Sequence, residues 1–163
     1  MSWYTLFVAV AGAAAALSGL LFVAFSLNLS SITTNPMHMG RSRETLATLV
    51  ILLIMSIFVL IPVQPRQLLG VELLLGGLWV LFRSVRSQLR TLSLLAEDQR
   101  LAWGRRNLLL NGATLCILIS GLSLLVGRFG GLYWLVPTIA VYFPWAIINA
   151  WVLVVRVGGE SRA

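Results

Sequence analysis

The chain has 163 residues, of which 59% are hydrophobic and 10% are charged, and its mean hydropathy is +0.94. A soluble domain carries about 25% charged residues, so this composition excludes an ordinary water-soluble fold and predicts a membrane protein. All twelve basic residues are arginine, the net charge is +7, and the single cysteine excludes an intramolecular disulfide. In a membrane protein a basic excess indicates orientation and does not favour nucleic acid as a partner.

Five apolar segments follow one another along the chain, and each is read as a helix because lipid offers the backbone no other partner. A bilayer core about 30 Å thick needs about 20 apolar residues per helix. The start of the chain lacks the basic region of a signal peptide, so we expect its apolar run to be retained as the first span. The sequence predicts one integral membrane domain over residues 1–163, an all-α bundle of about five transmembrane helices at 3–29, 45–61, 68–82, 108–127 and 132–155.

The second and third apolar segments are short and are joined through Pro62 and Pro65. We expect two spans connected by a tight turn. A re-entrant hairpin that enters and leaves the membrane on one side would give the same charge balance, and this alternative stays open at the level of sequence.

The third segment continues into an arginine-rich stretch over residues 83–103. Val85 and Leu89 recur at helical spacing, whereas Arg83, Arg86 and Arg90 share a different face. This pattern is typical of an amphipathic cytoplasmic helix that contacts the anionic inner leaflet or a protein partner. A solvated connector that packs against its neighbours fits the pattern equally well.

Arginines also predict the orientation of the bundle. With five spans, ten of the twelve arginines fall on one side of the membrane. The positive-inside rule therefore places the N-terminus outside and the C-terminus in the cytoplasm. The absence of lysine, with abundant Ala, Leu, Gly and Val, is interpreted as the signature of a GC-rich bacterial genome, and the expected location is the bacterial inner membrane.

The first helix carries a line of small residues that ends in hydroxyl groups. Such a face permits close helix contact, and it also suits a narrow passage with an apolar constriction and a polar vestibule. The candidate pore-lining residues are Gly12, Ala16, Gly19, Val23, Ser26 and Ser30. The alternative is that the serines only cap the helix or bond to neighbours near the interface.

Other small residues predict helix contacts in the fourth span. Gly112, Cys116 and Ser120 share one ridge, and Ser123 and Gly127 share another. Asn111 lies near them and is expected to form a hydrogen bond to a neighbouring helix.

Glu72 is the most informative single residue, because a carboxylate inside a membrane span is costly and often functional. It is a candidate ion or proton site in the outer half of the bundle. The alternative is structural: Glu72 pairs with Arg66 or Arg128, or reaches water directly.

The sequence carries no catalytic constellation. It has one histidine, no paired carboxylates within a span and no phosphate-binding loop, so we do not expect an enzyme. No cofactor or metal site is expected either. His38 lies between Met37 and Met39, which are soft ligands for copper, but the segment is interpreted as a plain loop.

Two stretches carry a family resemblance. "AGAAAALSGLLFVAFSLNL" and "RETLATLVILLIMSIFVLIPVQPRQLLGVELL" resemble a family of small bacterial inner-membrane proteins, some of which are labelled modulators of the protease FtsH. Separately, "ALSGLLFVAFSLNL" resembles the pore helix of Orai-type calcium channels. That resemblance implies pore-lining places for Gly19, Leu20 and Val23, but it puts Leu27 where the family has its selectivity glutamate and so implies no calcium filter.

These patterns together favour a homo-oligomeric membrane pore or ion channel with the first helix near the central axis. Subunits of this size motivate oligomerisation, because a bundle of about five helices has little room for a water-filled path. The alternative is a non-conducting accessory subunit or modulator of a larger inner-membrane complex, such as a membrane protease.

Overall fold

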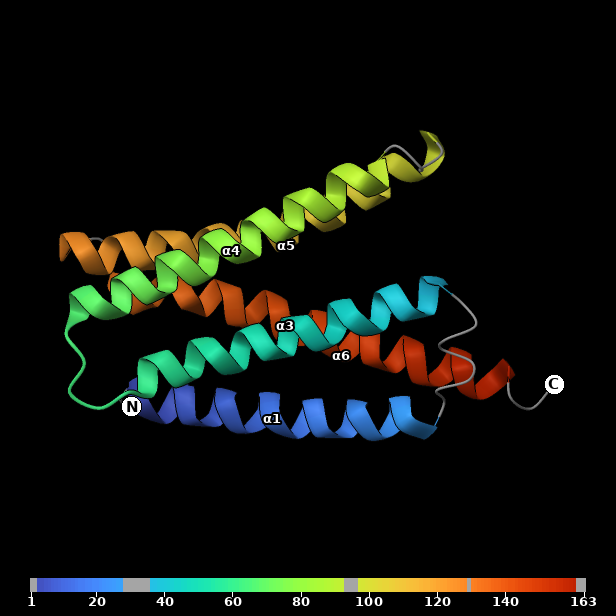
Figure 1. The fold of residues 1–163 in the computed structure, drawn as a ribbon, viewed down its shortest axis with the longest axis horizontal. Helices are drawn as coiled ribbons and strands as arrows, with labels where there is room; N and C mark the ends of the chain where they lie inside the picture. Colours follow the sequence, from blue (N-terminus) through green and yellow to red (C-terminus); the bar gives the residue numbers. More distant parts are fainter. Residues whose placement is uncertain (1–2, 28–35, 93–96, 129, 161–163) are drawn as a thin grey trace. The chain divides into compact units, whose positions relative to one another are not determined.

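The computed structural model describes residues 3–27, 36–92, 97–128 and 130–160 and is helical almost throughout this part of the chain (Figure 1). Five helices are long and apolar enough to cross a membrane, which confirms the predicted fold class. They are α1 (Trp3–Leu27), α3 (Pro36–Leu60), α4 (Arg66–Leu92), α5 (Glu97–Val126) and α6 (Leu135–Glu160), with the short 3-10 helix η1 (Gly131–Trp134) before α6.

The second helix begins earlier than expected. α3 starts at Pro36 rather than near residue 45, so the segment around His38 that was expected to be a loop is helical. Proline suits the first position of a helix, because its fixed φ angle is helical and its missing N–H needs no partner there. α3 and α4 have 25 and 27 residues, or about 37 Å and about 40 Å at 1.5 Å per residue. Their apolar spans, Arg43–Leu60 and Arg66–Leu89, have 18 and 24 residues and are long and apolar enough to cross a membrane.

The arginine-rich stretch is divided between two helices. Residues 83–92 continue α4, as predicted, but α5 already begins at Glu97. The expected single helix over residues 83–103 is therefore wrong in its second part, since residues 97–103 form the first turns of α5. The stretch is amphipathic along its length, and this periodicity alone does not reveal where the chain reverses.

The chain divides into two compact units. One contains residues 1–60 with residues 142–163, and the other contains residues 61–141, so α6 contributes to both. In the first unit α1 packs along α3. Its core is a cluster of apolar side chains around Leu21, Leu49 and Ala146, against which Leu17, Phe25, Leu46 and Ala150 pack.

In the second unit α4 packs along α5 through glycines. A Cβ atom added at Gly70 would lie 2.9 Å from the carbonyl oxygen of Gly121, and one added at Gly121 would lie 2.8 Å from that of Gly70. Both are closer than a real Cβ contact, so the two backbones touch where neither residue has a side chain. A Cβ at Gly77 would likewise meet the Leu118 side chain at 2.7 Å.

The connection from α5 to α6 is fixed by serines of α5. Ser123 donates to the carbonyl oxygen of Arg128 and accepts from the Gly131 amide at 2.9 Å. Ser120 donates to the Gly131 carbonyl oxygen at 3.1 Å. Gly127 and Gly130 supply positive φ angles at the turn, a backbone conformation that glycine adopts without steric cost.

Candidate functional site: the outward face of α1, Glu72 and the arginines of α4

α1 has one face that packs and one that does not. Its buried residues are Phe7, Val10, Ala14 and Leu21, spaced three or four residues or a multiple apart, so they share one helical face. Leu21 belongs to the cluster with Leu49 of α3. This spacing fixes which face of α1 the rest of the unit uses.

The predicted pore-lining residues lie on the opposite face, about 180° away at about 100° per residue. Gly12, Ala16, Gly19, Val23 and Ser26 are all exposed, whereas Ser30 lies outside the described residues. A Cβ atom built at Gly12 or Gly19 meets nothing within 4 Å. Among the residues that the structure describes, the small-residue line from Gly12 to Ser26 therefore takes no part in the packing of α1 within its unit.

The α1 serines bond to their own helix. Ser26 donates to the Phe22 carbonyl oxygen at 2.9 Å, and Ser18 donates to that of Ala14 at 2.8 Å. Such bonds satisfy a hydroxyl donor in an apolar setting and leave the oxygen lone pairs able to accept. The face that ends at Ser26 is thus apolar with a polar end that needs no partner from another helix.

Glu72 is half-buried near the start of α4 and is paired with an amide. Gln64 Nε2 donates to Glu72 Oε2 at 2.6 Å. Among the side chains that the structure describes, neither Arg66 nor Arg128 forms an ion pair with this carboxylate, and both arginines are exposed. Gln64 Oε1 is buried without a hydrogen-bond donor. The structure therefore brings Glu72 together with Gln64, one of the polar residues just before α4, and not with an arginine.

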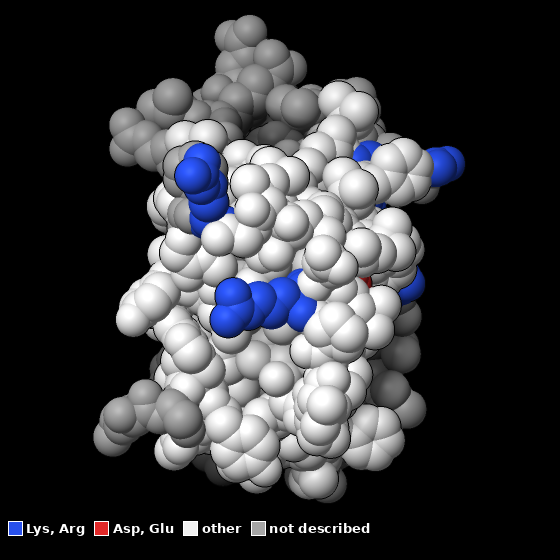
Figure 2. All heavy atoms as spheres, turned by 90° about the vertical axis from the view of Figure 1, so that its left-hand side faces the viewer, with Lys and Arg blue, Asp and Glu red and all other residues white. Residues whose placement is uncertain are grey.

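Two of the three arginines in the second half of α4 have side chains that the structure describes. Arg83 and Arg86 are exposed, and the guanidinium carbon of Arg83 lies 5.6 Å from the centre of the Trp79 ring. Arg90 lies within α4, but its side chain is outside the described set. Figure 2 shows basic side chains standing apart on largely uncharged surface, with very little acidic surface on the face it draws.

A polar group between α4 and α5 includes one predicted residue. Asn111 Oδ1 accepts from Ser84 at 2.9 Å and from Gln88 at 3.1 Å, and Asn111 Nδ2 donates to Gln88 Oε1 at 3.0 Å. The expected interhelical bond of Asn111 is confirmed. We refer to Ser84, Gln88 and Asn111 as the polar clamp.

The glycine contact of α4 and α5 was missed from the sequence. The expected ridges of α5 were built on Gly112 and Gly127, yet a Cβ at either meets nothing within 4 Å, whereas Gly121 touches Gly70. The signal that points to the true contact is the spacing in α4. Gly70, Leu73, Gly77 and Ser84 follow a seven-residue pattern, which places them on one side of the helix.

Comparison with known proteins adds no relative: the chain matches no family model, no curated protein and no solved structure.

Proposed function

We propose that this chain is the subunit of a homo-oligomeric membrane pore in which α1 lies near the central axis. The observation that carries the proposal is the outward small-residue face of α1. Lipid tails are as apolar as leucine, so helices in a membrane associate through close packing, and small residues permit that approach. The packed face of α1 is used within the chain, which leaves this face for neighbouring copies.

The same face suits the wall of a narrow pore. Gly12, Ala16 and Gly19 are small, Val23 forms an apolar ring in the assembly, and the Ser26 oxygen accepts hydrogen bonds at the cytoplasmic end. Apolar constrictions gate by dewetting, and hydroxyl groups below one hold water. Glu72 belongs to the outer mouth in this proposal, where a carboxylate attracts cations. The distribution of arginines supports an outside N-terminus. The absence of lysine, with abundant Ala, Leu, Gly and Val, supports a bacterial inner membrane as the location.

Cysteine crosslinking tests the assembly. In a Cys116→Ser background, Gly12→Cys and Gly19→Cys are expected to form disulfide-linked dimers in membranes. Ala13→Cys is the matched control, because Ala13 is small and exposed but about 100° away around the helix. Equal crosslinking at Ala13 and Gly12 would count against an interface on the small-residue face.

Electrical recording tests conduction. Purified protein in planar bilayers is expected to carry current, Val23→Ser to increase it by hydrating the constriction, and Gly19→Phe to abolish it. Glu72→Gln is expected to lower cation selectivity without loss of assembly. Crosslinked oligomers that carry no current over a range of ions, voltages and pH would reject the pore and favour a non-conducting accessory subunit.

A further inference from the structure

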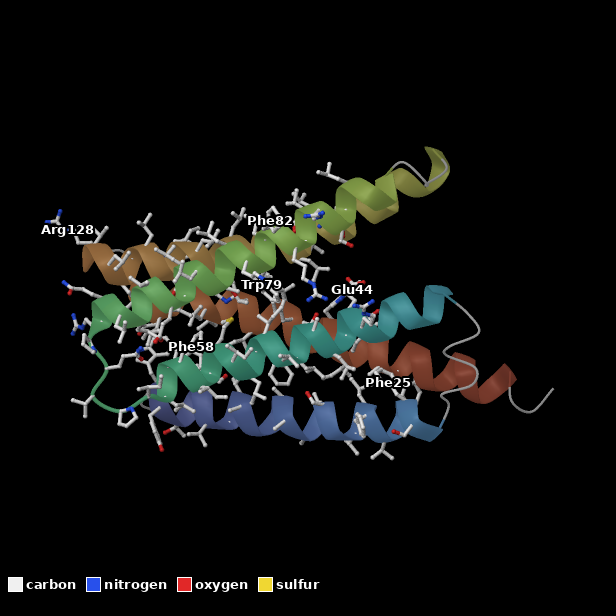
Figure 3. The ribbon with its side chains drawn as sticks, viewed as in Figure 1. Phe25, Glu44, Phe58, Trp79, Phe82 and Arg128 are labelled. Atoms are coloured by element: carbon white, nitrogen blue, oxygen red, sulfur yellow. The ribbon has the colours of Figure 1, made fainter. Side chains whose placement is uncertain are left out.

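The face of α4 that lies opposite α5 combines large apolar residues with arginines. Gly70, Leu73 and Gly77 face α5, and the opposite side carries Leu75, Trp79 and Phe82, which are 60–64% exposed. Arg83 and Arg86 are exposed on the same side. At about 100° per residue these five residues fall within an arc of about 100°. Trp79 and Phe82 are labelled on α4 in Figure 3.

The distances along α4 match one leaflet of a bilayer. Arg66 and Arg86 are about 30 Å apart at 1.5 Å per residue, which equals the hydrocarbon thickness of a bilayer. Leu75 then lies near the midplane and Arg86 at the hydrocarbon boundary. The run from Leu75 to Arg86 is about 16 Å long, close to the length of one acyl chain layer.

The two guanidinium groups are available to a ligand. Arg83 lies over the Trp79 ring and is held there by a cation–π contact. This contact uses the face of the guanidinium, so the N–H groups at its edge can still donate to a ligand. Among the side chains that the structure describes, no carboxylate forms an ion pair with Arg83 or Arg86. The planar donor groups of arginine bind phosphate oxygens in pairs, and this fits a phosphodiester better than a lysine would.

We propose that this face is a binding site for an anionic phospholipid, with the acyl chain along Leu75, Trp79 and Phe82 and the phosphate at Arg83 and Arg86. The order of apolar and then basic residues is that of a lipid's tail and headgroup. An acidic protein segment would match the arginines but not the apolar run beside them. The chain's net charge of +7 gives the same preference for a negative ligand. The site does not depend on the proposed pore, and its place in the inner leaflet follows from the arginine count.

Native mass spectrometry of the full chain tests the site. The protein is released from nanodiscs of phosphatidylglycerol and phosphatidylcholine in equal amounts, and the lipids that stay bound are counted. The wild-type protein is expected to retain phosphatidylglycerol in preference to phosphatidylcholine. Arg83→Gln and Arg86→Gln should each reduce that preference about fivefold, because one basic residue at an anionic surface contributes about 1 kcal/mol.

Arg66→Gln is the matched control. Arg66 is exposed on the same helix, at the opposite boundary, and its loss removes the same charge. Wild-type preference in the Arg83→Gln/Arg86→Gln double variant, or an equal loss in Arg66→Gln, overturns the site. Inorganic phosphate at high concentration should leave the bound lipid in place, and its release by phosphate would show that the apolar run contributes nothing.

A second measurement needs no arginine variant. Phosphatidylglycerol with brominated acyl chains is expected to quench part of the tryptophan fluorescence of wild type more strongly than brominated phosphatidylcholine. That difference should be lost in Trp79→Phe and kept in Trp151→Phe, since Trp151 is a similarly exposed tryptophan of another helix. Equal quenching by the two lipids in wild type would contradict the proposal.

Discussion

The two pairs of neighbouring helices, α1 with α3 and α4 with α5, are held together by opposite means. α1 and α3 meet through bulky side chains such as Leu21 and Leu49. α4 and α5 meet through Gly70 and Gly121, whose backbones touch, and through the polar clamp. α1 also contains Gly12 and Gly19, but a Cβ atom added at either meets nothing within 4 Å, whereas the contact of α4 with α5 requires Gly70 and Gly121.

The comparison shows what a glycine pattern in a membrane helix can mean. Gly70, Gly77 and Gly121 are used in the packing of α4 against α5, whereas a Cβ atom added at Gly12 or Gly19 of α1 meets nothing within 4 Å. A line of small residues that makes no contact within the chain's described residues is a stronger candidate for contact between copies than a line that already packs against a neighbouring helix. The two pairs should therefore respond to substitution in opposite directions.

Making a side chain smaller should damage the α1–α3 pair most. Leu49→Ala is expected to lower the free energy of unfolding by about 2–5 kcal/mol, because Leu49 is fully buried and its loss leaves a cavity. Unfolding of the reconstituted protein in mixed micelles measures this effect. Leu20→Ala is the matched control, since Leu20 is 68% exposed, and it should change the stability by less than about 0.5 kcal/mol.

Making a side chain larger should damage the α4–α5 pair. Gly121→Ala is expected to cost about 1–3 kcal/mol, because the new methyl group meets a backbone oxygen that moves only if the helices separate. Gly112→Ala on the same helix meets nothing and is the control for helix propensity. If both alanines gave the same stability in the unfolding titration, the two backbones would not be in contact.

Removing the polar clamp should have a smaller effect. Asn111→Ala removes the bonds across the two helices but leaves Gln88 donating to Ser84 within α4. Hydrogen bonds between membrane helices contribute about 0.6 kcal/mol on average and about 1.7 kcal/mol at most. A double-mutant cycle with Gln88→Ala measures the coupling. If the stability loss of the double variant equalled the sum of the losses of the two single variants, Asn111 and Gln88 would not be in contact.

The smallest effect is expected at Gly12, where an added Cβ atom meets nothing within 4 Å. Gly12→Ala should leave the fold unchanged or stabilise it by up to about 1 kcal/mol, since alanine is the better helix former and the added methyl group meets no atom. The same unfolding titration in monomeric protein measures this. A loss of stability comparable to that of Gly121→Ala would remove the difference between the two helix pairs.

The sequence predicted the number and type of the helices because apolar length decides both in a membrane. It failed at ends set by other causes, such as Pro36, which lets α3 begin well before its apolar part, and Glu97, where the arginine-rich stretch reverses. Asn111 was found because a lone amide in an apolar helix needs a partner. The Gly70–Gly121 contact was missed because small residues outnumber contacts, and spacing within one helix does not say which neighbour it meets.

The serines that hold the α5–α6 connection have a consequence for where that turn can lie. Ser120 and Ser123 supply to the backbone of Arg128 and Gly131 hydrogen bonds that water provides in most loops. Because these backbone groups bond to serine side chains, the turn can lie at the edge of the hydrocarbon without water molecules to satisfy them. A tag inserted between Arg128 and Gly131 would therefore be expected to break these hydrogen bonds and to disturb the start of α6.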